Sequence, residues 1–175
     1  MKELNRNKSK NGNAFQNKLY EEYVSTYAGA AYFKNNNSYY VEGIGKKISD
    51  VEMELASHPK IRIIFEATTS LRDDRYWAKE VQAKLIKNSI KEMGKRCIYV
   101  LVVPDDTYYD INSKEPENNK HFESIVNSGV AKTSGVGGID LFVRESEIYN
   151  LIRCIDNDKY QMPNRIINNY KMNKI

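Results

Sequence analysis

The sequence predicts a protein of the α/β class with one mixed central β-sheet, made of an antiparallel meander and parallel strands, and with helices on both faces. Two observations predict this fold. A pattern typical of an amphipathic helix precedes three strand patterns that follow one another at short intervals. After these strands, helix patterns alternate with apolar strand patterns up to residue 155. The expected order is helix, three strands, helix, strand, helix, strand, helix, in one domain.

The first helix is expected to begin after Asn13, a suitable N-cap residue. Its apolar residues recur every four positions: Phe15, Leu19, Tyr23 and Tyr27. Residues 1–12 are polar and basic, and we expect them to form a flexible arm. The domain then extends over residues 13–155, and residues 156–175 are a C-terminal extension of it.

Three strands should follow the first helix. The stretch "KNNNS" at 34–38 has the composition of a turn, and "SYYVEGIG" at 38–45 has that of a strand ending in flexible glycines. The next two patterns, at 47–56 and 60–70, alternate polar and apolar residues and are joined through "SHPK". We therefore predict a hairpin that turns at His58.

A long helix is predicted from Asp73 to Met93, and Gly94 is a suitable residue to end it. The residues expected to face the sheet are Trp77, Val81, Leu85, Ser89 and Met93, with Gln82, Ile86 and Ile90 beside them. The continuous apolar run "RCIYVLVV" at 96–103 is typical of a strand that is covered on both faces.

The rest of the chain is predicted to complete the sheet. A long polar loop opens at Pro104, and we interpret "PDD" at 104–106 as a turn. A helix near 120–127 should lead to the strand "GIDLFV" at 138–143 and to the helix "ESEIYNLIRCI" at 145–155.

Composition and cysteine usage exclude several classes of protein. No run approaches the roughly 18 apolar residues of a membrane span, and the N-terminus lacks the apolar segment of a secretory signal. Cys97 and Cys154 stand apart, which suits reduced, buried thiols in a cytoplasmic protein. The net charge of +4 permits a polyanionic partner without requiring one.

A hairpin that turns at His58 brings two carboxylates together. Directly opposed residues of an antiparallel pair point to the same face, so Asp50 should face Glu66. In the same register Glu54 should face Arg62. The other face is then entirely apolar and holds Val51, Met53, Leu55, Ile61, Ile63, Phe65 and Ala67. A slip by one residue would mix the two faces, so the pattern specifies the register.

Two adjoining carboxylates repel each other unless a cation lies between them. Mg²⁺ binds one or two carboxylates and keeps water and phosphate oxygens as its other ligands. Asp50 and Glu66 are therefore candidate magnesium ligands. The alternative is that Glu66 pairs with a nearby Lys or Arg on a solvated face of the sheet.

Asp50, the hairpin and the tripeptide Glu66-x-Thr68 resemble the core of the PD-(D/E)XK nucleases. The helix, meander, long helix and strand around them, over residues 14–155, are also similar to that core. The resemblance implies a restriction-endonuclease-like fold in which Asp50 and Glu66 bind Mg²⁺, with Mn²⁺ able to substitute. Ser49 stands where the family has Pro. Thr68 stands where the family has the Lys that positions or polarises the attacking water.

Tripeptides of the Glu-x-Thr kind are similar to those of a group of type IIS restriction endonucleases, in which the missing cationic or imidazole group comes from the next helix. Here the resemblance implies Lys84 on that helix, with Lys79 on the opposite edge as the rival. The implied catalytic residues are Asp50, Glu66, Lys84, Thr68 and Lys79. The residues expected to bind DNA phosphates are Lys46, Lys47, Arg72, Arg75 and Lys84.

The resemblance implies a Mg²⁺-dependent DNA endonuclease of the type II or IIS restriction kind. It also implies a small catalytic subunit that cleaves one strand of double-stranded DNA beside a larger recognition subunit, or a homodimer. We find no segment in the sequence that is free to read bases, and residues 160–175 are a candidate docking surface. Two alternatives stay open: a repair or junction-resolving nuclease of the same fold, and a non-catalytic DNA-binding or assembly subunit.

Overall fold

The computed structural model describes residues 2–69, 73–105 and 138–157 of the chain. They contain a five-stranded mixed sheet with the strand order β1-β2-β3-β4-β5. The strands are β1 (Ala31–Val41), β2 (Gly45–Leu55), β3 (Ile61–Ala67), β4 (Arg96–Val103) and β5 (Leu141–Arg144). The first three are antiparallel neighbours, whereas β4 is parallel to β3 and β5 is parallel to β4. The predicted α/β class with a mixed sheet is confirmed.

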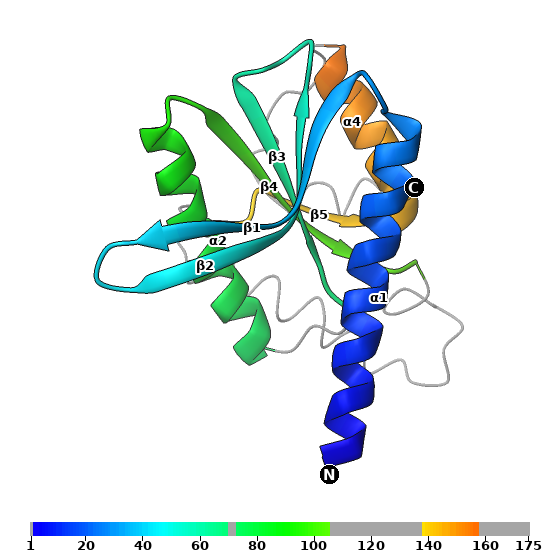
Figure 1. Ribbon diagram of the computed structural model, residues 1–175, viewed down its shortest axis with the longest axis vertical. Helices are drawn as coiled ribbons and strands as arrows, with labels where there is room; N and C mark the ends of the chain where they lie inside the picture. The colour runs from blue at the N-terminus through cyan, green and yellow to red at the C-terminus, as the bar shows by residue number, and fades with distance from the viewer. Residues whose placement is uncertain (1, 70–72, 106–137, 158–175) are drawn as a thin grey trace.

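Helices cover both faces of the sheet (Figure 1). The helical elements are α1 (Lys2–Thr26), α2 (Asp73–Glu92), η1 (Glu145–Glu147) and α4 (Ile148–Asp156). Phe65 of β3 points to the face covered by α1 and α4, and its ring centroid lies 5.2 Å from that of Tyr23. Successive strand residues alternate between faces, so Glu66 points to the opposite face, where it contacts Lys79 of α2.

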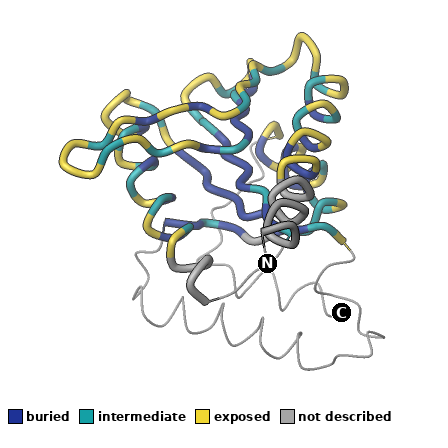
Figure 2. Tube along the Cα trace, turned by 60° about the horizontal axis from the view of Figure 1, so that its bottom comes forward, coloured by how far each residue is buried: buried dark blue, intermediate teal, exposed yellow. Residues whose placement is uncertain are grey.

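The main hydrophobic core lies between the sheet, α1 and α4, and Figure 2 shows the buried centre of the sheet. Its largest contributions include Leu19, Tyr23, Met53, Phe65 and Ile152. β4 is buried from Cys97 to its end, which confirms the prediction of a strand covered on both faces. Within the described ranges, no helix has the length and apolarity needed to span a membrane.

Helix α1 begins at Lys2, so the prediction of a helix start at Asn13 after a flexible arm is wrong. Residues 2–10 contain Lys, Glu, Leu and Arg, which are good helix formers. One interior glycine such as Gly12 costs only about 1 kcal/mol relative to alanine. The polar composition therefore does not end the helix.

The asparagine-rich stretch at 34–38 lies inside β1, so the predicted turn there is wrong. Asn36 adopts a left-handed backbone with φ of 52°, a conformation that asparagine tolerates better than most residues. The ladder with β2 is complete on both sides of Asn36 but lacks the pair between Asn36 and Asp50. The turn-forming sequence thus produces a local break within a long strand.

The predicted register of the hairpin formed by β2 and β3 is confirmed. The paired residues are Val51 with Phe65, Glu52 with Ile64, and Met53 with Ile63. The connecting turn contains His58, whose ring Nε2 lies 3.1 Å from the carbonyl oxygen of Asp156. The apolar face of this hairpin lies in the core, as its alternating pattern predicts.

The predicted apolar stripe of α2 is only partly right: Ile86 and Ile90 are buried as expected, but the line through Val81 and Met93 is wrong. Val81 and Met93 are 56% and 58% exposed, and the residues buried against the sheet are Ala83, Ile86 and Ile90. A series taken at every fourth residue drifts by about 40° per step around an α-helix with 3.6 residues per turn. Five such residues cannot share one face of the helix. Residues that follow one another at alternating spacings of four and three do stay on the face that lies against the sheet.

Several other predictions concern the end of the domain. The loop after Pro104 and the helix near 120–127 lie outside the described residues, apart from a turn at Asp105. The final strand and helix are present as β5 and α4, with η1 between them. Cys97 is buried as expected, but Cys154 is exposed, so its predicted place in the core is wrong.

Candidate active site

Asp50 of β2 and Glu66 of β3 lie side by side on the face of the sheet that α2 covers. The paired residues of β2 and β3 end with Val51 and Phe65, and Asp50 and Glu66 each lie one residue beyond that last pair. The Ala67 N–H donates to Asp50 Oδ2 at 2.9 Å, which fixes the Asp50 carboxylate against β3. Glu66 is only 4% exposed. The structure therefore brings together the two predicted metal ligands.

The buried Glu66 carboxylate has partners on both oxygens. Lys79 Nζ lies 2.5 Å from Oε1, and the Tyr99 hydroxyl donates to Oε2 at 2.8 Å. Gln82 Nε2 lies 3.5 Å from the same Oε2. Burial, reinforced by the charge of Glu66, raises the pKa of Tyr99, so its hydroxyl stays a donor. Lys79 thus pairs with Glu66 as the alternative expected, but Glu66 is buried and does not lie on a solvated face.

The surroundings of Asp50 disfavour the charged form of its carboxyl group. Burial and, next, the negative charge of Glu66 raise the pKa of Asp50 from 3.8 to about 7. Lys79 and the Ala67 N–H oppose this rise without cancelling it. A divalent cation beside both carboxylates would favour the charged form of Asp50.

The donor set fits a hard divalent cation. Both candidate ligands are carboxylates, and Mg²⁺ prefers oxygen ligands and completes its octahedron with water and phosphate oxygens. Within residues 13–69, 78–105 and 138–157, where side chains are described, no three His, Cys, Asp or Glu side chains converge. A structural zinc site needs four protein ligands. Asp50 and Glu66 are the residues that could hold the Mg²⁺ or Mn²⁺ expected from the sequence.

The two lysines considered for the missing cation lie in different places. Lys79 contacts Glu66, whereas the Lys84 side chain is exposed. The preference for Lys84 followed from the mistaken stripe, because the sheet-facing line of α2 runs through Lys79, Ala83 and Ile86. Thr68 is buried, and its N–H donates to the Val102 carbonyl at 2.9 Å. The described geometry places Lys79 beside the acid pair.

The predicted DNA-binding residues are only partly described. Lys46 is exposed and Lys47 is half-buried, and both lie in β2, on the strand that also carries Asp50. Arg72 and the side chain of Arg75 lie outside the described part of the chain.

Glu80, which sequence reasoning missed, fixes the rotation of α2. It is 4% exposed, and its Oε2 accepts the N–H groups of Gly138 at 2.5 Å and Ile139 at 3.0 Å. A Cβ at Gly138 would lie 2.3 Å from the Glu80 carbonyl oxygen and from the Lys84 nitrogen. This close approach holds α2 in the rotation that directs Lys79 toward the sheet. The glycine pair before the last strand was the available signal.

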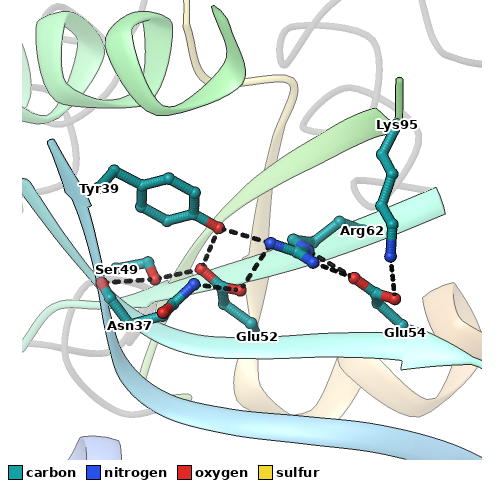
Figure 3. A network of polar contacts seen from close by, with 7 residues as sticks. All are labelled: Asn37, Tyr39, Ser49, Glu52, Glu54, Arg62 and Lys95. Carbon is teal, nitrogen blue, oxygen red and sulfur yellow. Dashed lines mark hydrogen bonds and ion pairs between the residues drawn. The ribbon is translucent and has the colours of Figure 1, made fainter. Parts of the chain in front are cut away.

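A second buried carboxylate, Glu52, also escaped prediction (Figure 3). Its oxygens accept from Asn37 Nδ2 at 3.0 Å, the Tyr39 hydroxyl at 2.5 Å and the Ser49 hydroxyl at 2.6 Å. Arg62 NH1 lies 3.5 Å from Glu52 and also donates to the Tyr39 hydroxyl at 3.1 Å. We call these five residues the Glu52 network. The period-two run of acids in β2 was its only signal in the sequence.

The predicted pairing of Glu54 with Arg62 is present and extends the same row of charges. Arg62 Nε donates to Glu54 Oε1 at 2.6 Å, and Lys95 Nζ donates to Oε2 at 2.6 Å. Glu54 is thus neutralised by two cations. Lys79 pairs with Glu66 and lowers the pKa of Asp50, but it does not offset the effects of burial and of the Glu66 charge on Asp50.

Gln16 of α1 stabilises the break in the β1–β2 ladder at Asn36. Gln16 Nε2 donates to Asn35 Oδ1 at 2.7 Å, to Asn36 Oδ1 at 3.0 Å and to the Asp50 carbonyl at 3.2 Å. This one amide therefore ties the side chains of Asn35 and Asn36 to the backbone of Asp50 across the missing pair. It positions Asp50 from the opposite face of the sheet.

The chain was also compared with known proteins. No protein-family model matches it, and neither a curated protein nor a solved structure matches it. A function for this protein therefore has to be inferred from the arrangement of Asp50, Glu66 and Lys79.

Proposed function

We propose that the protein is a Mg²⁺-dependent endonuclease that hydrolyses phosphodiester bonds of DNA with an activated water. One observation carries this proposal: two opposed carboxylates and a lysine meet on the sheet beneath α2. The order of helix, antiparallel meander, helix and parallel strand supports it, because it is the order expected from the resemblance to PD-(D/E)XK nucleases.

The residues would divide the work as follows. Asp50 and Glu66 would hold the metal ion, which supplies polarisation of a phosphoryl oxygen and a water of lowered pKa. Lys79 would orient the attacking water and offset negative charge that develops on the phosphate. Tyr99 and Gln82 would keep the Glu66 carboxylate in one orientation through their bonds to Oε2.

The proposal also concerns the partners of the chain, which are double-stranded DNA and a second subunit. The chain would cleave one strand of double-stranded DNA as a small catalytic subunit, beside a larger recognition subunit or a second copy of itself. A repair or junction-resolving nuclease would use the same site, and cleavage of branched in preference to linear duplex would identify it.

A non-catalytic DNA-binding or assembly subunit is the second candidate. It is favoured by the partners of Glu66, because Lys79 and Tyr99 satisfy that carboxylate without a metal ion. Against it stands Asp50, whose pKa of about 7 reflects a charge that the protein alone does not compensate. Measured metal binding would separate the two candidates.

The test measures metal binding and cleavage separately. Mn²⁺ binding, followed by electron paramagnetic resonance, should occur in the wild type and be lost in Asp50→Asn and Glu66→Gln. Nicking of supercoiled plasmid in Mg²⁺ should be abolished by the same changes. Glu92→Gln, which alters an exposed acid of α2, is the matched control and should leave both unchanged. A wild type that binds no Mn²⁺ would refute the nuclease and favour the non-catalytic subunit.

A further inference from the structure

The β1–β2 hairpin continues far beyond the rest of the sheet. β1 pairs with β2 up to Val41 and Gly45, whereas the ladder between β2 and β3 covers only residues 51–53 and 63–65. Residues 37–49 therefore form a two-stranded segment, here called the ribbon, which pairs only with itself in the described structure. Figure 1 shows the ribbon reaching away from the sheet, and Figure 2 shows its exposed tip.

The ribbon is turned relative to the sheet. Ser49 and Glu52 are three residues apart in β2 and would point to opposite faces of a regular strand. They nevertheless share a hydrogen bond of 2.6 Å. The break at Asn36 thus reverses the alternation, so Tyr39 of the ribbon is buried while Tyr40 is 80% exposed.

The exposed face of the ribbon combines a cation with aromatic and aliphatic groups. Tyr40 is directly opposed to Lys46, and Ser38 to Ile48, so these four side chains share one face. Ile48 is 41% exposed, and Ile44 in the connecting turn is 54% exposed. Lys47 lies on the other face. The only acid among residues 37–49 is Glu42, so the ribbon is basic overall.

The ribbon is held at its base. Three of its residues, Asn37, Tyr39 and Ser49, donate to the single buried carboxylate of Glu52. Gln82 Nε2 of α2 also donates to the Ile48 carbonyl at 2.9 Å. A ribbon fixed in this way loses little conformational entropy when it binds a partner.

We propose that the ribbon lies in a groove of duplex DNA, an inference that rests on and deepens the proposed nuclease function. The major groove of B-DNA admits a two-stranded β-ribbon. Lys46 and Lys47 provide the charge that complements phosphates, and Tyr40 and Ile48 provide contact surface for the groove. The sequence alone pointed to no segment free to read bases, and the ribbon has the form of such a segment.

The ribbon also leads directly to the site. Its last residue, Ser49, precedes Asp50 in β2. Four residues at about 3.3 Å each separate Lys46 from Asp50 along the strand, or roughly 13 Å. That length corresponds to about four base pairs of duplex. The contact of Lys46 is therefore expected within about four base pairs of the cut.

The test measures binding without cleavage. Affinity for a fluorescent duplex is measured by anisotropy at low salt in Ca²⁺. Lys46→Ala and Tyr40→Ala should each weaken binding about five- to tenfold, and Lys46→Ala should reduce the salt slope by about one. Lys60→Ala, in the turn between β2 and β3, and Tyr32→Ala, in β1, alter exposed residues outside the ribbon, and they should change nothing. Thermal unfolding verifies that all four variants are folded.

Crosslinking extends the test to weak binding. A photoreactive phenylalanine derivative at Tyr40 should crosslink to duplex, and the same group at Tyr32 should not. Equal affinities of ribbon and control variants, or equal crosslinking, would overturn the proposal. A changed oligomeric state with unchanged DNA affinity would also overturn it and assign the ribbon to a protein partner. Loss of binding on ribbon substitution in a protein that binds no Mn²⁺ would retain the ribbon proposal and refute the nuclease.

Discussion

At the scale of single residues, Asp50 makes the stability of the metal-free protein depend on pH. Its carboxyl group titrates near 3.8 when unfolded and near 7 when folded, because burial and Glu66 disfavour the charge. The folded state therefore binds more protons between these values, and the free energy of unfolding falls as pH rises through them. Asp50→Asn should raise that free energy at pH 8 by on the order of 1–2 kcal/mol.

The comparison across pH makes this prediction specific. Below about pH 4 the carboxyl is protonated in both states, so Asp50→Asn should have almost no effect there. The asparagine oxygen can still accept the Ala67 N–H, which keeps the geometry. Urea unfolding at pH 4 and pH 8 measures the difference. A variant equally or less stable than the wild type at both values would contradict the assignment.

The lysine prediction also belongs to single residues. Lys79→Ala should lower the rate of cleavage far more than Lys84→Ala, because Lys79 Nζ lies 2.5 Å from Glu66 while Lys84 is exposed. Initial rates of plasmid nicking at saturating Mg²⁺ give the comparison. The reverse order of effects would show that the helix supplies its cation from the other edge in the DNA-bound protein.

At the scale of elements, the contact between Gly138 and α2 sets the position of the whole helix. A Cβ at residue 138 would lie 2.3 Å from two backbone atoms of α2, so Gly138→Ala forces the helix outward. We expect a loss of about 2–3 kcal/mol of stability, as for an overpacked core. Activity should fall further than in a variant of equal stability, because Lys79 moves with the helix.

A second glycine supplies the control for this change. Gly29 has φ of 80° and nothing within 4 Å of a Cβ, so Gly29→Ala should cost only about 1 kcal/mol through backbone strain. Chemical unfolding and nicking rates are measured for both variants. Equal effects at the two positions would mean that the contact with α2 is unimportant.

The ribbon is the other element whose behaviour can be predicted. Glu52→Ala removes the acceptor of three donors and one charge partner of Arg62, which should cost about 2–4 kcal/mol. Amide hydrogen exchange should quicken most within residues 37–49. Glu52→Gln, which keeps an oxygen acceptor, should show a smaller change. Uniform acceleration over the whole sheet would show that the Glu52 network does not anchor the ribbon in particular.

At the scale of the whole molecule, we expect the isolated chain to bind DNA weakly and with little sequence preference. Only four side chains share the exposed face of the ribbon, and specific readout usually needs several base-edge contacts. The chain alone should be nearly inactive on duplex and should cut one strand when joined by a recognition subunit. Sequencing of product ends tests this, and a specific double-strand cut by the chain alone would refute it.

The sequence could predict those features that depend on a single repeating pattern of apolar residues. The alternation from Val51 to Leu55 and from Ile61 to Phe65 permits only one register that leaves a fully apolar face. That register brings Asp50 opposite Glu66 without further information. The buried run of β4 could be recognised for a similar reason, because both of its faces are apolar.

The features that could not be predicted depend on contacts between distant segments. The stretch at 34–38 has turn composition, and only Gln16 of α1 and the facing strand make it part of β1. The sheet-facing line of α2 is fixed by Glu80 and Gly138, which are 58 residues apart. The choice between Lys79 and Lys84 depends on that line, so the sequence alone left it open.

One arm of the ribbon and Asp50 belong to the same strand, β2. The number of residues between them therefore sets the distance between the DNA contact of the ribbon and the cut. Removal of two residues from each arm of the ribbon would shorten its reach by about 6.6 Å, or about two base pairs. Each arm must lose an even number of residues, because removal of one residue would turn the arm over and bury Tyr40 in place of Tyr39. A family of shortened ribbons would then cut at correspondingly smaller offsets from the position that the tip contacts.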